Sequence, residues 1–254
     1  TGINNVNLHF IKYGAFTQIS KTYFENKLTS SFGLRIDGNS FTDNANSNNF
    51  SPRLSLAYNL NSKTSINSNI GRFHQLPSYT ILGFENNGKY LNKDVAYITC
   101  DHAVIGIEYN PSSYSKISLE SFYKRYSNYP FSILDSISLA NLGDDFGVVG
   151  NEDISSISKG NSYGIELLAQ QKMSSSIYGI LSATYYYSRF EDNEGKLISS
   201  KWDNRFILNM TAGKKFKNNI ELGIKYRYSG GSPYTPTDLI NSSNKSIWDI
   251  NQRG

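Results

Sequence analysis

The sequence has little cysteine, no long apolar run and little net charge, and each scarcity excludes a class of protein. Cys100 is the single cysteine among 254 residues, which excludes a disulfide framework or a cysteine-based zinc site within the chain. No apolar run reaches the roughly 18 residues of a transmembrane helix. The 25 Lys and Arg nearly balance the 21 Asp and Glu. These charges are too evenly spread to indicate a nucleic-acid partner.

Motifs for catalysis and cofactor binding are also missing. The three histidines, His9, His74 and His102, stand far apart, and no HExxH or GxSxG pattern occurs. No P-loop and no GxGxxG pattern is present either. We therefore expect no enzymatic activity, no cofactor and no metal site.

The abundant residues are those of a β-protein. Aromatic residues make up 14% of the chain, with 19 Tyr and 14 Phe, which argues against disorder. Apolar and polar side chains alternate with a period of two residues in many segments. In residues 220–228, aliphatic and tyrosine side chains alternate with Glu221, Gly223, Lys225 and Arg227. This alternation predicts a strand with one apolar and one polar face.

Ten such strands are predicted, all antiparallel neighbours in an all-β fold. Their ranges are 6–21, 27–37, 51–60, 64–73, 98–110, 116–128, 162–172, 177–190, 203–214 and 219–229. Most are longer than the strands of globular proteins, which have about 5 or 6 residues. A tilted strand that crosses a bilayer needs about 9–11 residues. The lengths therefore favour a transmembrane β-barrel.

The connections between the strands alternate strictly between short and long. The short turns are residues 22–26, 61–63, 111–115, 173–176 and 215–218. The long loops are residues 38–50, 74–97, 129–161, 191–202 and 230 onward. Outer-membrane barrels have short periplasmic turns and long extracellular loops, whereas a soluble sandwich has no reason to maintain this asymmetry.

Aromatic side chains collect near the predicted strand ends. They are Tyr13, Tyr23, Phe24, Phe50, Phe73, Tyr109, Tyr114, Tyr126, Tyr129, Phe190, Trp202 and Phe216. Rings of this kind form girdles at the two membrane interfaces of a barrel. Tyr and Phe are also good strand formers, so the girdle interpretation depends on strand length and loop asymmetry as well.

Five segments, taken in order, resemble the barrel motifs of TonB-dependent outer-membrane receptors. They are 50–58 (FSPRLSLAY), 70–77 (IGRFHQLP), 159–167 (KGNSYGIEL), 202–209 (WDNRFILN) and 226–236 (YRYSGGSPYTP). The richness in Asn, Ser, Lys and Tyr is similar to the Bacteroidetes branch of the family. The resemblance implies that residues 1–254 are one partial domain, the C-terminal part of a β-barrel. Neither a plug domain nor the last strands would be included.

The resemblance also implies a location, a function and partners. The location is the bacterial outer membrane, and the function is uptake of a scarce solute such as a siderophore, vitamin, glycan or peptide. The partners are the surrounding outer-membrane lipid, the receptor's own plug domain, the TonB complex acting through the plug, and a small-molecule or oligomeric nutrient. The start at Thr1 without Met and the polar end at Gly254 likewise lead us to expect a segment of a longer protein.

The long loops and the polar strand faces supply the candidate site residues. The candidates for ligand contact in the loops are His74, Gln75, Tyr79, Tyr90, Tyr129, Phe131, Phe146, Tyr234 and Trp248. Their rings could stack on a ligand, or they could pack the loops against one another. The charged residues expected to face the lumen and the plug are Arg35, Glu108, Glu120, Lys124, Glu166, Lys225 and Arg227.

Two other functions remain open at this point. The first is a passive, porin-like barrel without a plug, which would have the same strands and the same location. The second is a soluble all-β carbohydrate-binding module, which long strands with continuous apolar faces argue against.

Overall fold

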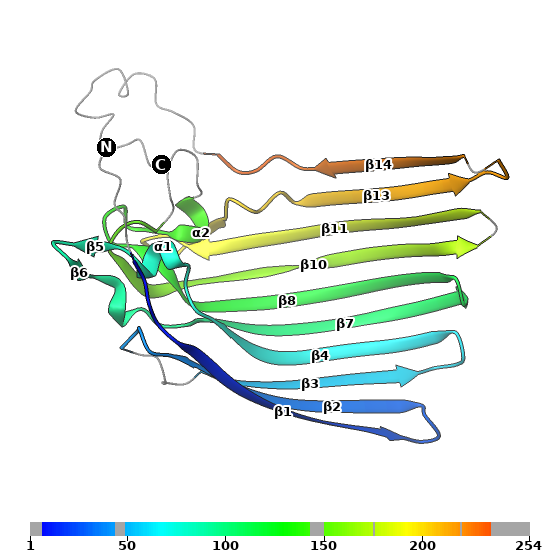
Figure 1. The fold of residues 1–254 in the computed structure, drawn as a ribbon, viewed down its shortest axis with the longest axis horizontal. Helices are drawn as coiled ribbons and strands as arrows, with labels where there is room; N and C mark the ends of the chain where they lie inside the picture. Colours follow the sequence, from blue (N-terminus) through cyan, green and yellow to red (C-terminus); the bar gives the residue numbers. More distant parts are fainter. Residues whose placement is uncertain (1–6, 44–48, 143–149, 175, 219, 235–254) are drawn as a thin grey trace, which may run out of the picture.

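Ten long antiparallel strands follow one another in chain order across a single sheet (Figure 1). The computed structural model describes residues 7–43, 49–142, 150–174, 176–218 and 220–234. The long strands are β1 (Lys12–Tyr23), β2 (Leu28–Asn39), β3 (Phe50–Asn59), β4 (Thr64–Gln75), β7 (Ile98–Ser112), β8 (Ser115–Ser132), β10 (Ile154–Ser174), β11 (Ile177–Glu191), β13 (Phe206–Lys215) and β14 (Glu221–Ser229). No helix in the described ranges is both long and apolar enough to cross a membrane.

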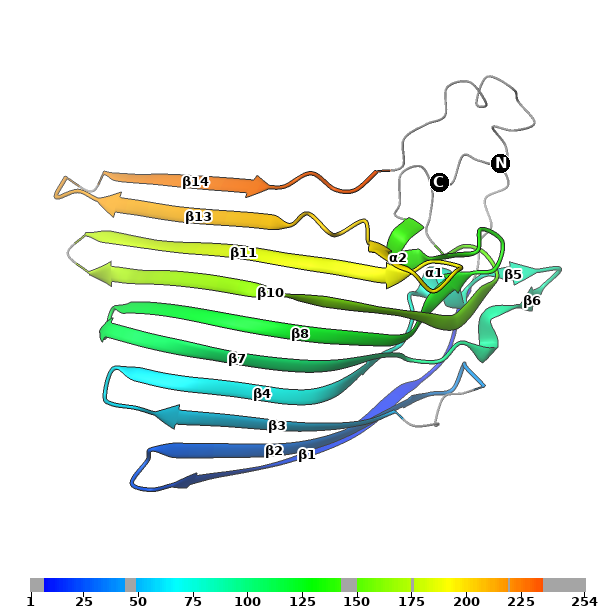
Figure 2. The same cartoon turned by 180° about the vertical axis from the view of Figure 1, so that it is seen from behind.

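The two ends of the sheet differ, as the alternation of connections predicts. All the short turns lie at one end and the long connections at the other, as both views show (Figures 1 and 2). The β1–β2 turn is tight, with positive φ angles at Phe24, Glu25 and Asn26 (55°, 51° and 70°). The long connections together form a folded cap over the opposite end, which we call the long-loop end.

Small secondary-structure elements, which the sequence did not predict, lie in the long connections. They are α1 (Tyr79–Leu82), β5 (Glu85–Asn86), β6 (Lys89–Tyr90), the 3-10 helix η1 (Asn92–Asp94), β9 (Ile137–Ser138), α2 (Leu139–Leu142) and β12 (Leu197–Ser199). Each is too short to show a period of its own in the sequence. Their form therefore depends on packing against the sheet and against one another.

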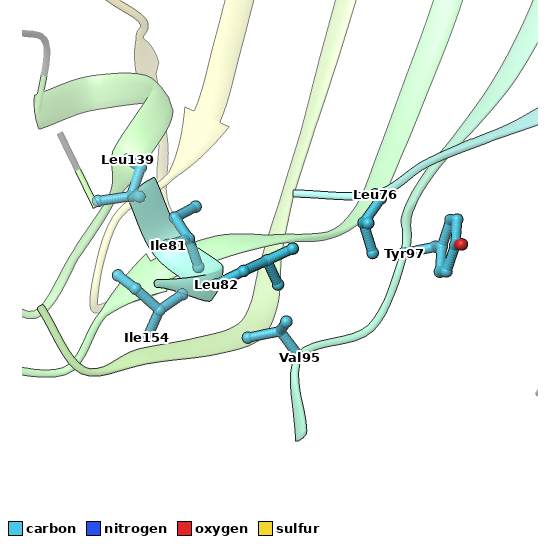
Figure 3. Packing of buried hydrophobic residues seen from close by; sticks show 7 residues of the cluster. All are labelled: Leu76, Ile81, Leu82, Val95, Tyr97, Leu139 and Ile154. Atoms are coloured by element: carbon cyan, nitrogen blue, oxygen red, sulfur yellow. The ribbon is translucent and has the colours of Figure 1, made fainter. Parts of the chain in front are cut away.

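The hydrophobic core lies among these connections rather than between two sheet faces. Leu76, Val95 and Tyr97 pack with residues from α1, α2 and the start of β10. Figure 3 shows the side chains of Leu139, Ile154 and Val95 gathered around Ile81 and Leu82 of α1. Leu82 has no exposed surface. This core holds the loop cap on the end of the sheet.

The pairing register gives the sheet one apolar and one polar face. Ile66, Ile107, Leu119, Leu167 and Ala183 are direct partners in a row across β4, β7, β8, β10 and β11. Ile107 and Leu119 are 45% and 49% exposed, and in water such a surface would be unfavourable. We call the face that carries this row the outer face.

The opposite face, the inner face, carries small and polar residues. Ser65, Asn67 and Asn69 of β4 lie on it, between the outer-face residues of the same strand. Gly106 of β7 pairs with Glu120 of β8. A Cβ atom at Gly106 would lie 2.7 Å from Cγ of Glu120 and 3.1 Å from the carbonyl oxygen of Leu119. Glycine therefore leaves room for the Glu120 side chain on the inner face.

All ten predicted strands are present, but several of their boundaries were wrong. The first strand begins at Lys12 instead of residue 6, and β10 begins at Ile154 instead of residue 162. Residues 129–132, which were predicted to lie in a loop, extend β8 because Ser132 and Phe131 pair with Ile154 and Ser155. Backbone pairing continues past the apolar alternation, so the pattern alone underestimates the strand length.

Candidate ligand site at the long-loop end

A pocket of about 730 Å³ opens in the loop cap beside the start of β1. Its lining comes from the segment that leads into β1, from α1 and the residues after it, and from Asn151. The lining residues are Asn7, Leu8, Phe10, Lys12, Tyr79, Thr80, Gly83 and Asn151. Its size falls within the range of small-molecule sites, about 300–1,000 Å³.

Aromatic rings from the segment before β1 and from two of the long connections meet around this pocket. Phe10 lies edge-on to Tyr79 with ring centroids 5.8 Å apart, and Phe41 lies 5.5 Å from Phe10. Tyr90 of β6 extends the group, 5.3 Å from Phe41. Its hydroxyl donates a hydrogen bond of 2.9 Å to the backbone oxygen of Asn7. Tyr79 is 58% exposed, so its ring is available for stacking with a ligand.

Two lysines place positive charge on this aromatic group. The ammonium of Lys12 lies 5.0 Å from the ring centroid of Tyr79 and donates a hydrogen bond of 3.2 Å to its hydroxyl. The ammonium of Lys93 lies 5.6 Å from the ring centroid of Phe41. Cation–π contacts of this kind keep the ammonium groups close to the rings. The site therefore combines apolar stacking surfaces with positive charge.

Asn92 of η1 holds the connections around the pocket together. Its side-chain amide nitrogen donates hydrogen bonds of 2.8 Å to the backbone oxygens of both Ile81 and Glu152. Its side-chain oxygen accepts a hydrogen bond of 2.9 Å from the backbone N–H of Ile154. Asn92 has no exposed surface. One buried amide thus joins α1, η1 and the segment leading into β10.

Two of the predicted loop candidates, Tyr79 and Tyr90, meet in this aromatic group. Phe10 contacts Tyr79, Phe41 contacts Tyr90, and the contact between Phe10 and Phe41 joins the two pairs. Sequence analysis missed Phe10 and Phe41 together with Lys12. Phe10 and Lys12 fell inside the predicted first strand, 6–21, and nothing in the alternation separates them from ordinary strand residues. Only the tertiary contact with α1 identifies them.

The other loop candidates are not brought to the pocket. His74 and Gln75 are the last residues of β4, so their prediction as loop residues was wrong. His74 Nδ1 lies within hydrogen-bond distance of Ser51 Oγ, at 2.9 Å. Tyr129 and Phe131 lie in β8, and the ring of Tyr129 packs 4.7 Å from that of Phe190.

Three loop candidates remain, and one of them is among the described residues. Tyr234 is 80% exposed and does not line the pocket. Phe146 and Trp248 lie outside the described residues.

The charged residues predicted for the lumen all fall on the inner face. The pairing register places there Arg35, Glu108, Glu120, Lys124, Glu166, Lys225 and Arg227. Arg35 donates two hydrogen bonds, of 2.8 and 2.6 Å, to the carboxylate of Asp37, and Glu108 forms an ion pair with Lys116. Glu120 and Glu166 are direct cross-strand partners, an arrangement of like charges that is unfavourable without a cation nearby.

The described residues offer binding surfaces but no reactive centre. In the ranges that the structure describes, no three side chains of His, Cys, Asp or Glu are grouped to hold a metal ion. The described residues of the pocket lining include no carboxylate, thiol or imidazole. This arrangement can recognise a ligand and hold it at the long-loop end.

The comparison of sequence profiles decides the family. The family described as "TonB dependent receptor-like, beta-barrel" matches residues 4–251. The chain belongs to this family. It is therefore part of an outer-membrane receptor barrel rather than a porin-like barrel or a soluble carbohydrate-binding module, the two alternatives considered above. Members of the family are receptors and transporters and not enzymes.

Solved structures of TonB-dependent receptors share the fold of this barrel segment. The ferripyoverdine receptor of the outer membrane of Pseudomonas aeruginosa is 18% identical with a TM-score of 0.64, over 88% of this chain and 29% of that chain. The FrpB iron transporter from Neisseria meningitidis is 14% identical with a TM-score of 0.61, over 87% and 32% of the two chains. The ferric-catecholate import receptor Fiu from E. coli is 12% identical with a TM-score of 0.63, over 87% and 34%.

The chain therefore spans about a third of the length of the receptors that it matches. A comparison with curated protein sequences found no significant match. The family assignment explains the two faces of the sheet, because lipid contacts the outer face of such a barrel and the lumen lies on the inner side. It also explains why the loop cap, and not the sheet, contains the hydrophobic core.

Proposed function

We propose that this TonB-dependent receptor takes up a scarce solute across the outer membrane, and that the long-loop end is extracellular. Residues 1–254 form part of the barrel wall and of the extracellular vestibule, and contribute no chemistry of their own. Binding alone cannot accumulate a solute, because a passive pore only equilibrates it. The TonB complex, pulling on the receptor's plug domain, supplies the energy.

The observation that carries this proposal is the pocket at the long-loop end. Its lining combines the exposed ring of Tyr79, the ring of Phe10 and the ammonium of Lys12. Aromatic faces stack on planar groups, and an ammonium attracts an anionic oxygen. Among siderophores, vitamins, glycans and peptides, this lining best suits an anionic ligand with aromatic groups, such as a ferric catecholate.

The inner face supports contact with a plug domain. Glu120 and Glu166 face each other across β8 and β10, and Lys225 and Arg227 project from the same face of β14. A plug that offers a cation to the two glutamates and carboxylates to β14 would relieve this local imbalance. The Asn-, Ser-, Lys- and Tyr-rich composition supports placement in the Bacteroidetes branch.

The test is uptake by cells that express the full-length receptor containing this chain. Radiolabelled iron in a catecholate siderophore is the first probe, and labelled cobalamin, an oligosaccharide and a peptide complete the panel. We expect uptake that an uncoupler of the proton gradient abolishes. Lys12→Ala or Tyr79→Ala should weaken binding about tenfold, because each removes a contact worth about 1–2 kcal/mol.

Matched controls lie at the other end of the sheet. Lys27→Ala and Tyr114→Ala remove side chains of the same two types, a lysine and a tyrosine, at the short-turn end. Both variants should leave uptake unchanged. Uptake that continues undiminished in the presence of the uncoupler would contradict energy coupling. Equal losses at both ends of the sheet would contradict the assignment of the pocket.

A further inference from the structure

A depression of about 610 Å³ lies on the outer face of the sheet, away from the pocket in the loop cap. Its apolar lining comes from five adjacent strands, β2, β3, β4, β7 and β8. The apolar lining residues are Phe32, Pro52, Leu54, Ile70, Ala103 and Tyr123. The pairing register places every one of them on the outer face.

A change in side-chain size along one row produces this depression. Leu54, Ile70, Ala103 and Tyr123 are consecutive partners across β3, β4, β7 and β8. The methyl group of Ala103 is the smallest side chain of the four, and larger side chains flank it on both sides. The result is a hollow with apolar walls in the surface that lipid covers, and its shape suits a hydrocarbon chain.

A group of charged residues borders the depression on the side of the long-loop end. Arg72 of β4 donates hydrogen bonds of 2.7 and 2.9 Å to the two carboxylate oxygens of Asp101 on β7. Arg125 of β8 is the cross-strand partner of Asp101 on its other side. Among the described residues, none forms a hydrogen bond or an ion pair with the guanidinium of Arg125. Two guanidinium groups and one carboxylate leave a net positive charge.

Neighbouring residues indicate the depth of this group in the membrane. The rings of Tyr123, Tyr163 and Tyr187 stack side by side on the outer face, with centroid distances of 6.4 and 5.2 Å. Arg125 and Arg189 stand two residues further along β8 and β11, toward the long-loop end. A tyrosine row marks the headgroup level of a bilayer. The arginines thus lie at the level of the phosphates in the outer leaflet.

We propose that this part of the outer face is a binding site for a phosphorylated lipid of the outer leaflet. One phosphate binds between Arg72 and Arg125, where Asp101 holds the Arg72 guanidinium in place. One acyl chain of the same lipid occupies the hollow over Ala103. The inference depends on the proposed orientation of the barrel, with the long-loop end outside, but not on the identity of the transported solute.

The structure favours a lipid over a free anion because the charged and apolar parts are continuous. Arg72, Asp101 and Arg125 line the same depression as Leu54, Ile70 and Ala103. A free phosphate would use only the arginines and leave the hollow unfilled. Guanidinium groups form bidentate contacts with phosphate oxygens, and a chain of buried CH₂ groups adds about 0.8 kcal/mol for each group.

Native mass spectrometry of the full-length receptor, delipidated in detergent and titrated with diphosphoryl lipid A, tests the site. We expect the wild type to retain one tightly bound copy. Arg125→Gln should weaken binding about tenfold, because it removes one charge-assisted contact. Ala103→Phe should weaken binding to a similar extent by filling the hollow. Dephosphorylated lipid A should bind the wild type as weakly as diphosphoryl lipid A binds the Arg125→Gln variant.

Two matched variants serve as controls for charge and for bulk. Lys124→Gln removes a positive charge from the adjacent residue of β8, whose side chain lies on the inner face. Ala183→Phe places the same ring on the outer face of β11, away from the depression. Both should bind lipid A like the wild type. Heat-modifiable gel mobility identifies the folded fraction of each variant before titration.

Three results would overturn the proposal. The first is unchanged binding in both Arg125→Gln and Ala103→Phe, and the second is an equal loss in their controls. The third is equal affinity of the wild type for lipid A and its dephosphorylated form, because recognition of phosphate would then be refuted. Solute uptake is measured separately in cells. Normal uptake by a receptor that does not distinguish lipid A from its dephosphorylated form would refute the lipid site and leave the proposed transport function intact.

Discussion

Asn92 shows how a single polar residue can organise an irregular region. It is fully buried, yet all three of its polar contacts go to backbone groups of other segments. Buried backbone groups must find partners, because an unsatisfied group costs about 1–3 kcal/mol. This one side chain bonds to backbone groups of Ile81, Glu152 and Ile154, and thereby joins the pocket wall formed by α1 to the start of β10.

We therefore expect Asn92→Ala to loosen the loop cap without unfolding the sheet. The substitution removes all three hydrogen bonds of the Asn92 side chain, and should lower the free energy of local opening by about 2–4 kcal/mol. Hydrogen exchange of the amides in residues 79–97 measures this change. Asn86→Ala, at an exposed position in β5, is the control. Unchanged protection in Asn92→Ala would contradict the role of Asn92 as a connecting residue.

Strand β8 shows how one element faces two solvents. Leu119 belongs to the apolar row on the outer face, whereas the next residue, Glu120, points to the inner face and pairs with Gly106 and Glu166. Successive side chains point to opposite faces of a strand. Of two residues adjacent in sequence, one therefore faces the lipid and the other faces the lumen. The same substitution should therefore have different effects at these two positions.

Leu119→Arg should destabilise the folded barrel by about 2–4 kcal/mol, the range for a cation near the midplane on the lipid side. Glu120→Arg introduces the same side chain one residue later, where it faces Glu166, and should be tolerated. Urea unfolding of the full-length receptor in lipid vesicles gives both values. Similar destabilisation at the two positions would show that the faces are assigned wrongly.

At the scale of the whole molecule, the described strands form an open sheet. In the part of the chain that the structure describes, β1 pairs only with β2 and β14 pairs only with β13. Their outward backbone groups have no strand beside them, and unpaired backbone is unfavourable in a bilayer. The neighbouring strands that a barrel requires would come from the rest of the receptor.

Residues 1–254 expressed alone should therefore aggregate rather than form a stable barrel. Refolding into detergent followed by size-exclusion chromatography and gel mobility with and without heating measures this. The full-length receptor under the same conditions should give a monodisperse species with heat-modifiable mobility. The same behaviour from residues 1–254 alone would contradict the expectation, and would mean that the two sheet edges can pair with each other.

The repeated features of the fold could be predicted from the sequence. The ten strands, the asymmetry of their connections and the apolar outer face follow from local alternation, because a side chain's face depends on its position in the strand. The charges of Arg35, Glu120 and Lys225 were assigned to one face for the same reason. The ends of β8 and β10 were missed, since polar residues that still pair do not alternate.

The candidate site could be predicted only in part. Tyr79 and Tyr90 were identified as exposed loop aromatics, but Phe10, Phe41 and Lys12 became partners only through contacts between distant segments. His74 and Tyr129 were equally plausible in sequence, and they pack elsewhere. Ring stacking and charge interactions depend on the distances between atoms, and the composition of the chain and the spacing of residues along it do not give those distances.

The sequence by itself determined the class of the molecule: an antiparallel β-barrel wall with lipid on one side, water on the other and unequal ends. Those properties are periodic, and a period of two residues can be seen without any contact in space. The tertiary structure alone decided which loops fold onto each other, where the pocket in the loop cap and the depression on the outer face lie, and which charges border them. These properties arise from contacts between residues far apart in the sequence, such as the hydrogen bond between Asn7 and Tyr90, which are 83 positions apart.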